Sequence, residues 1–191
     1  MTKIKDSLLD AYRMAGPEDR FTIMMENYNC FPGLICMAKK KLRYKLQAER
    51  EFLRSHNRGE LGVRVQTSAL GDPTADEAIL EATLDEAFVT GEIDRHLLTG
   101  IEDASLYETD IRLINIMITD YELLVDVVNS LNNNDFKIMK QFLVEKKLIK
   151  DIAEDEDRSY VAIKKRIARI RADIKEEILE CLEMSCRRCL V

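Results

Sequence analysis

The sequence predicts an all-α protein in which an N-terminal helical bundle is followed by a C-terminal helix-turn-helix with a long, extended last helix. Helix-breaking residues are scarce, since the 191 residues include only 7 glycines and 3 prolines. Apolar residues recur at three- and four-residue spacing almost throughout, and the alternation typical of strands is absent. The composition, 46% hydrophobic and 34% charged, is that of a water-soluble globular protein.

Three helices are expected in the first third of the chain. A short amphipathic helix starts at Ile4 and ends near Gly16, and a second is predicted over Phe21–Tyr28. The sequence Asn-Cys-Phe-Pro-Gly at 29–33 predicts a turn. A longer helix follows over Leu34–Ser55. Its apolar side carries Leu42, Leu46, Phe52 and Leu53.

A segment without apolar periodicity interrupts the middle of the chain. Residues 56–71 hold three of the glycines, so we expect a linker or loop there. Asp72 and Pro73 then predict a helix start, because Asp caps helices and proline has no N–H to leave unpaired in the first turn. This helix should run to about Val89, and a short helix or turn is expected at 92–100.

The most apolar stretch predicts a buried central helix. Residues 106–131 are apolar on nearly every face, which is typical of a helix enclosed by others. We therefore divide the chain into a helical N-terminal region at 1–131, including the loop at 56–71, a helix-turn-helix domain at 132–185, and a tail at 186–191.

The C-terminal part contains two helix-start signals. Asn134 or Asp135 is expected to cap a helix of which Phe136 is the first apolar residue, and a short helix follows at 149–154. After a polar break, Ser159 is expected to cap the last helix. An apolar stripe then recurs at three- and four-residue spacing, and comprises Tyr160, Ile163, Ile167, Ile170, Ile174 and Ile178.

The other face of this last helix is cationic. Six basic residues and no acidic residue occur between Arg158 and Arg171. A helix with one face on a core and the other cationic suits the major groove, because cations neutralise phosphates and arginine binds guanine in a bidentate manner. A basic face can also be merely solvated. The predicted DNA-binding residues are Arg158, Ser159, Tyr160, Lys164, Lys165, Arg166, Arg169 and Arg171.

Residues 136–174 resemble the promoter-binding C-terminal region of sigma-70 family factors. In that family a helix with an Ile-Ala-Glu step leads through a turn into a Ser-capped recognition helix with alternating arginines. The corresponding residues here are Ile152-Ala153-Glu154, Ser159, Ala162-Ile163, Lys164, Arg166-Ile167 and Arg169. The chain departs from the family in two places. Glu156-Asp157-Arg158 stands where the family has apolar-Gly-apolar, and Lys146-Lys147 stands where it has Gly-Leu.

A second resemblance involves the upstream Asp72-Pro73-Thr74 helix start. This start, paired with a sigma-like C-terminus, is similar to small phage regulators of late transcription of the RinA and ArpU kind. The resemblance implies a transcription regulator encoded by a phage or another mobile element, with double-stranded DNA as partner. The interpretation also allows RNA polymerase and a second copy of the chain as partners. The alternative is a non-enzymatic helical interaction factor in which the helix-turn-helix is structural.

Charge is strongly segregated along the chain. The net charge is +5 over residues 1–71, −13 over 72–126 and +2 over 127–191. Residues 37–58 alone carry eight cations and two acids. These cations could touch DNA or could neutralise the acidic middle segment, and we favour the second.

No sequence signature predicts an enzyme, a cofactor or a bound metal ion. Cys181, Cys186 and Cys189 have the spacing of some metal sites, but no histidine lies near them, so we expect free thiols. His56 and His96 are expected at the surface. No apolar run is long enough to span a membrane, and the N-terminus does not look like a secretory signal. We therefore expect a cytoplasmic protein.

Overall fold

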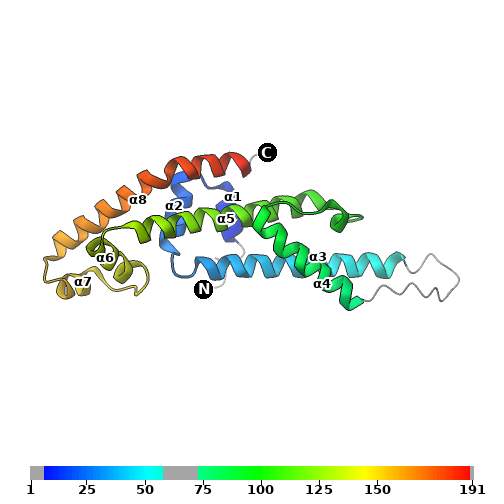
Figure 1. Ribbon diagram of the computed structural model, residues 1–191, viewed down its shortest axis with the longest axis horizontal. Coiled ribbons are helices and arrows are strands. Elements are labelled where there is room, and N and C mark those ends of the chain that lie inside the picture. The colour runs from blue at the N-terminus through cyan, green and yellow to red at the C-terminus, as the bar shows by residue number, and fades with distance from the viewer. Residues whose placement is uncertain (1–6, 58–72, 190–191) are drawn as a thin grey trace. The chain divides into compact units, whose positions relative to one another are not determined.

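The computed structural model describes residues 7–57 and 73–189, and within these ranges every regular element is a helix (Figure 1). The predicted all-α class is therefore confirmed. The helices are α1 (Ser7–Met14), α2 (Pro17–Glu26), α3 (Phe31–Asn57), α4 (Pro73–Thr90), the 3-10 helix η1 (Arg95–Leu98), α5 (Ala104–Ser130), α6 (Asn133–Leu143), α7 (Ile149–Asp155) and α8 (Tyr160–Cys189).

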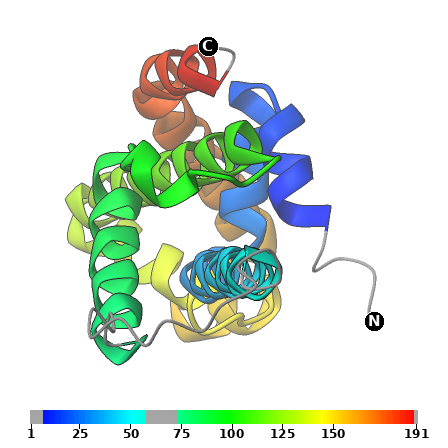
Figure 2. The same ribbon diagram turned by 90° about the vertical axis from the view of Figure 1, so that its right-hand side faces the viewer.

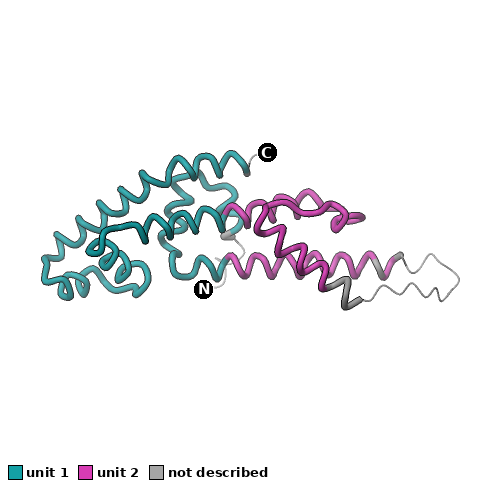
Figure 3. The backbone as a smooth tube through the Cα atoms, in the orientation of Figure 1, with its two compact units in different colours: residues 1–34, 117–191 teal, residues 35–116 magenta. Residues whose placement is uncertain are grey.

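The chain forms two compact units (Figure 3). Unit 1 comprises residues 1–34 and 117–191, and unit 2 comprises residues 35–116. Helices α3 and α5 each contribute to both units. This division differs from the boundary that we predicted at residue 131, because α8 packs against α2 and so joins the two ends of the chain in one unit.

Helices α2 and α3 begin earlier than their apolar spacing predicts, whereas the start predicted for the first helix, at Ile4, lies outside the described residues. Helix α2 starts at Pro17 rather than at Phe21, because proline is favoured in a first turn. The turn predicted at 29–33 is wrong in its second half, since α3 already starts at Phe31. Pro32 is tolerated there because the first turn of a helix needs no backbone donor at that position. Figure 2 views α3 almost along its axis.

Unit 2 is built from most of α3, from α4 and from the first half of α5. Its core contains Leu42, Leu46, Leu84, Phe88 and Ile111, each at most 4% exposed. Helix α4 starts at Pro73 and ends at Thr90, as predicted. The side chain of Asn115 closes its C-terminal end by donating hydrogen bonds to the carbonyls of Phe88 and Val89, at 3.2 and 2.7 Å.

Two predicted core residues of unit 2 are exposed. Phe52 and Leu106 have 59% and 57% of their surface in solvent. Both lie near the end of a helix that belongs to this unit, where fewer neighbours cover a side chain. The loop predicted at 56–71 begins too early, because His56 and Asn57 belong to α3; its remainder lies outside the described residues, as does the predicted cap at Asp72.

The second half of α5 belongs to unit 1 and is buried there, as predicted for residues 106–131. Met117, Leu124, Val127 and Val128 of α5 are buried. Helix α2 packs on α8, and Lys175 of α8 pairs with Glu18 of α2 at 3.0 Å. The tail predicted at 186–191 is helical as far as Cys189.

A buried polar cluster links four helices of unit 1. Arg20 is 1% exposed and lies 3.5 Å from the Asp120 carboxylate and 3.3 Å from the Ser185 hydroxyl. The hydroxyls of Tyr12 and Ser185 donate to the same Asp120 oxygen, at 2.7 and 3.1 Å. Burial raises the pKa of Asp120, and the hydrogen bonds and the Arg20 charge oppose this shift. The cluster fixes the C-terminal half of α8 against α1, α2 and α5.

Among the described residues, no helix combines the length and the apolarity needed to cross a membrane.

Candidate nucleic-acid interface

Helices α6, α7 and the first turns of α8 pack pairwise, and we call residues 132–171 the three-helix segment (Figure 1). Its first helix is capped by Asn132, whose side-chain oxygen accepts from the backbone N–H of Asp135 at 3.0 Å. Our prediction of Asn134 or Asp135 as the cap is wrong. The helix starts earlier, and Asp135 supplies the N–H that Asn132 satisfies.

Both connections of the three-helix segment contain a residue in the left-handed conformation. Lys146, between α6 and α7, has φ 55°, and Asp157, between α7 and α8, has φ 48°. Among the described residues, these are the two non-glycine positions with positive φ. Glycine adopts this conformation most readily, so two polar residues here occupy glycine-like positions.

Ser159 caps α8 as predicted. Its hydroxyl oxygen accepts from the backbone N–H of Ala162 at 3.2 Å, and its carbonyl accepts from the N–H of Ile163 at 3.1 Å. The preceding turn is tight, because the N–H of Arg158 bonds to the carbonyl of Ala153 at 2.9 Å. The start of α8 is thus fixed with respect to α7.

The inner face of α8 forms part of the unit 1 core. The buried stripe comprises Ile163, Ile167, Ile170, Ile174 and Ile178, and continues to Leu182. Tyr160 was predicted to belong to this stripe, but it is 48% exposed because it is the first residue of α8 and lies at the open end of the helix. The stripe therefore begins at Ile163.

The outer face of the first turns of α8 is cationic and otherwise small or apolar. The exposed cations are Arg158, Lys164, Lys165 and Arg169. The exposed uncharged residues beside them are Val161, Ala162, Ala168 and Ala172. Small side chains let the helix backbone approach a surface closely. Of the eight predicted DNA-binding residues, Lys164, Lys165 and Arg169 therefore lie on this outer face, and Arg158 lies exposed in the turn before α8.

Arg166 does not lie on this outer face. Its Nε lies 2.6 Å from Asp135 Oδ1, and its side chain is 40% exposed. Burial raises the pKa of Asp135, but hydrogen bonds from Arg166 and Asn132 outweigh that effect and lower it from its usual value of 3.8. Arg166 therefore joins α8 to the N-terminal end of α6, and this pairing could not be predicted from the spacing of residues within α8.

Acidic residues near α7 are largely matched by cations of the same segment. Lys147 lies 2.8 Å from Asp155, and Lys137 lies 2.9 Å from Glu156. The hydrogen bond from Lys147 to Asp155 also raises the pKa of the lysine. These pairs reduce the negative charge beside the outer face of α8.

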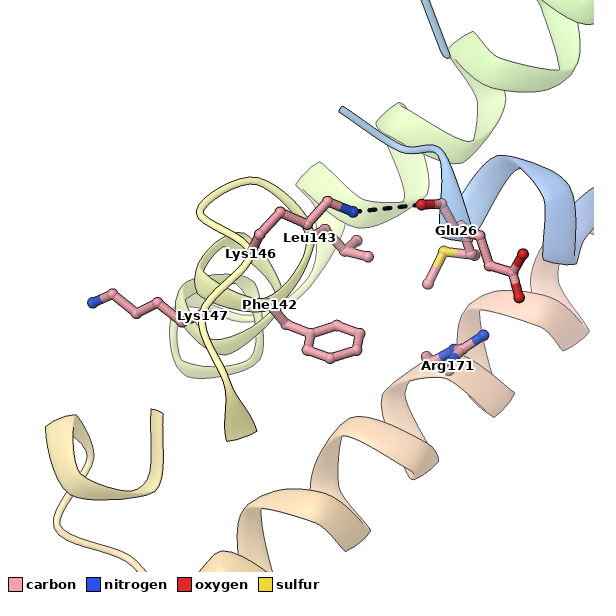
Figure 4. A pocket seen from close by; sticks show the side chains of 7 residues that line it. Glu26, Phe142, Leu143, Lys146, Lys147 and Arg171 are labelled. Atoms are coloured by element: carbon pink, nitrogen blue, oxygen red, sulfur yellow. Dashed lines mark hydrogen bonds between the residues drawn. The ribbon is translucent and has the colours of Figure 1, made fainter. Parts of the chain in front are cut away.

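Arg171 faces a pocket instead of the outer face of α8. The pocket has a volume of about 260 Å³ and lies between α2, the α6–α7 connection and α8 (Figure 4). Phe142 lines it, and Lys146, also in its lining, donates to the carbonyl of Glu26 at 3.5 Å. Arg171 and Glu26 both line the pocket (Figure 4). Arg171 is therefore half-buried between elements.

The charge of α8 changes sign along its length. From Asp173 onward its exposed residues are mainly acidic. They are Asp173, Glu176, Glu177, Glu180 and Glu183. A polyanion is therefore attracted to the first half of the helix and repelled by the second half.

The second basic run, on α3, pairs at least in part with the acidic middle of the chain. Arg43 forms an ion pair with Asp85, and Lys39 lies 5.2 Å from the centre of the Phe88 ring. Both partners are on α4. This arrangement supports neutralisation within unit 2, which is the use of these cations that we favoured.

The cysteine and histidine side chains that the structure describes do not gather into a centre. Cys181 is exposed, and the Cys186 thiol lies 3.8 Å from the carbonyl of Ala15. His56 and His96 are exposed, as expected. Among the residues that the structure describes, no three His, Cys, Asp or Glu side chains are placed to hold a metal ion together.

Comparison with known proteins found no matching protein family, no matching curated protein and no matching solved structure.

Proposed function

We propose that the three-helix segment is a sigma-like helix-turn-helix and that the protein is a sequence-specific, non-enzymatic regulator of transcription. The observation that carries this proposal is the outer face of α8. It presents Lys164, Lys165 and Arg169 at exposed positions, with Arg158 exposed just before the cap, on a helix whose other face is fixed to a core. The first acidic residue of the helix, Asp173, lies 3.7 Å from Arg169. Such a helix suits the major groove of duplex DNA.

The two left-handed residues support the sigma-like assignment. Lys146 and Asp157 stand at the positions where the resembling family has glycine, and both have the positive φ that glycine favours. The chain thus adopts a glycine-like backbone at both places where its sequence departs from the pattern. A phage or mobile-element origin, contact with RNA polymerase, dimerisation and a cytoplasmic location are further parts of this proposal.

The experiment is binding of a random-sequence duplex pool, measured by fluorescence anisotropy over a range of salt concentrations. The double variant Lys165→Ala/Arg169→Ala removes two cations from the outer face. If both contact phosphates, the slope of log K against log salt should fall by about 2 units. The matched control is Arg187→Ala/Arg188→Ala, which removes the same charge from exposed positions at the far end of the same helix.

The outcome separates this proposal from its alternative. Weakened binding in the first variant and near-normal binding in the control support DNA recognition by α8. No binding by the unaltered protein at low salt rejects it, and equal effects of the two variants reject the assignment to the outer face.

One observation favours a helical interaction factor as the second candidate. Leu148 and Val144, at the connection between α6 and α7, are 69% and 41% exposed. Exposed apolar residues at a helix connection can contact a protein partner. Failure to bind duplex DNA would leave this function as the better one.

A further inference from the structure

The side chains on the outer face of α8 limit which bases this helix can recognise. Several polar groups in or near the helix are already engaged. The Ser159 hydroxyl caps the helix, Arg166 is paired with Asp135, and Arg171 lies at the pocket. Along the middle of the outer face, Val161, Lys165 and Arg169 follow one another at intervals of one turn.

The composition of this face excludes the usual direct contact with adenine. In the major groove, adenine is bound in a bidentate manner by Asn or Gln, guanine by Arg or Lys, and the thymine methyl group by an apolar side chain. Residues 160–172 contain no Asn, Gln, Ser or Thr. They do contain the cations Lys165 and Arg169, and Val161 is 58% exposed.

The spacing sets how far apart the contacted bases lie. Four residues of an α-helix span about 6 Å, whereas successive base pairs are separated by about 3.4 Å. If α8 follows the groove, neighbouring contacts from Val161 and Lys165 fall about two base pairs apart. The exposed alanines at 162, 168 and 172 allow the close approach that these short distances need.

We propose that α8 recognises its DNA site through thymine and guanine: Val161 packs on a thymine methyl group, and Lys165 and Arg169 bind guanine N7 and O6. This inference rests on the proposed DNA-binding function. Adenine and cytosine are then specified only as the pairing partners of the bases that α8 contacts. A contact with a thymine methyl group would explain why Val161, an apolar residue in the first turn of α8, is exposed on the same face as Lys165 and Arg169.

The test uses base analogues in a duplex selected from a random pool by the full-length protein. Each thymine is replaced in turn by deoxyuridine, which lacks the methyl group. Each guanine is replaced by 7-deazaguanine and each adenine by 7-deazaadenine, which lack N7. We expect one deoxyuridine position to weaken binding about fourfold and at least one 7-deazaguanine position to weaken it about tenfold. The 7-deazaadenine positions should stay within about twofold.

Variants assign the contacts to residues. Val161→Ala should abolish the deoxyuridine effect. Val89→Ala, which alters a 76% exposed valine on α4, should leave that effect intact. Lys165→Ala should abolish the 7-deazaguanine effect about two base pairs from the sensitive thymine.

Three results would overturn the inference while leaving DNA binding in place. They are a flat analogue scan on a duplex that the protein binds, a loss with 7-deazaadenine as large as with 7-deazaguanine, and a deoxyuridine effect that survives in Val161→Ala. Absence of binding to any duplex would overturn the proposed function itself, and the inference with it.

Discussion

At the scale of single residues, two positions control how α8 is presented. Ser159 satisfies a backbone N–H at the start of α8, and Asp157 turns the chain between α7 and α8. Both act on the backbone, yet each determines where the outer face of α8 lies. Replacing Ser159 or Asp157 should therefore change the free energy of unfolding through the lost cap hydrogen bond or the positive φ.

Replacing the cap should destabilise the protein. Ser159→Ala leaves the N–H of Ala162 without its side-chain partner, and such losses cost about 1 kcal/mol. The free energy of unfolding, from urea titration followed by circular dichroism, measures the effect. Ser105→Ala, at an exposed serine in the first turn of α5, should change it by less than about 0.5 kcal/mol. Equal losses in the two variants would contradict a capping role.

The turn residue should prefer glycine over alanine. At Asp157 the backbone has φ 48°, so Asp157→Gly should be more stable than Asp157→Ala by about 1 kcal/mol. At Asp151, inside α7, the order should reverse by about the same amount, because glycine is the poorer helix former. Thermal unfolding of the four variants compares the two sites directly. The same order at both sites would argue against a left-handed turn.

At the scale of helices, the orientation of α8 depends on its contact with α6. The Arg166–Asp135 pair joins the two helices, whereas Arg169, one turn further along α8, is 83% exposed. Arg166 therefore holds α8 against α6, whereas Arg169 forms an exposed ion pair within α8, 3.7 Å from Asp173. The structure thus separates Arg166 from Arg169, which the sequence alone had placed together among the predicted DNA-binding residues.

The pair between α6 and α8 should make stability depend on pH in the acid range. Because the pKa of Asp135 is lowered in the folded protein, its contribution is present above the usual value of 3.8 and is lost as pH falls through the folded value. The difference in unfolding free energy between the unaltered protein and Asp135→Asn should thus shrink from about pH 6 to about pH 2. Asp126→Asn, at an exposed carboxylate of α5, is the control. A constant difference across this range would rule out the charged pair as its cause.

At the scale of the whole molecule, unit 1 is held together by contacts between the two ends of the chain. The buried Arg20 belongs to α2, whereas Asp120 and Ser185 belong to α5 and α8. A buried charge whose partner has been removed is costly, even where the pair itself contributes little. The cluster should therefore behave as one unit when its members are replaced.

A double-mutant cycle tests this coupling. Arg20→Met alone should lower the unfolding free energy by about 3–5 kcal/mol, because Asp120 is left buried without its cation. Arg20→Met combined with Asp120→Asn should cost clearly less than the sum of the two single changes. If the single variants are too unstable to measure, Tyr12→Phe and Ser185→Ala give a milder cycle around the same carboxylate. Additive costs in either cycle would show that these residues act independently.

The sequence by itself determined those features that arise from residues a few positions apart in one helix. The all-α class, the start of α4 at Pro73, the cap at Ser159 and the buried stripe from Ile163 onward all follow from spacing and capping within a few residues. Tertiary structure decided what depends on distant partners. Arg20 meets Ser185 across 165 positions, and Arg166 meets Asp135 on another helix. Periodicity identifies the buried face of a helix but not the element that covers it, so only the folded chain separates the cations that fix α8 from those that it presents to solvent.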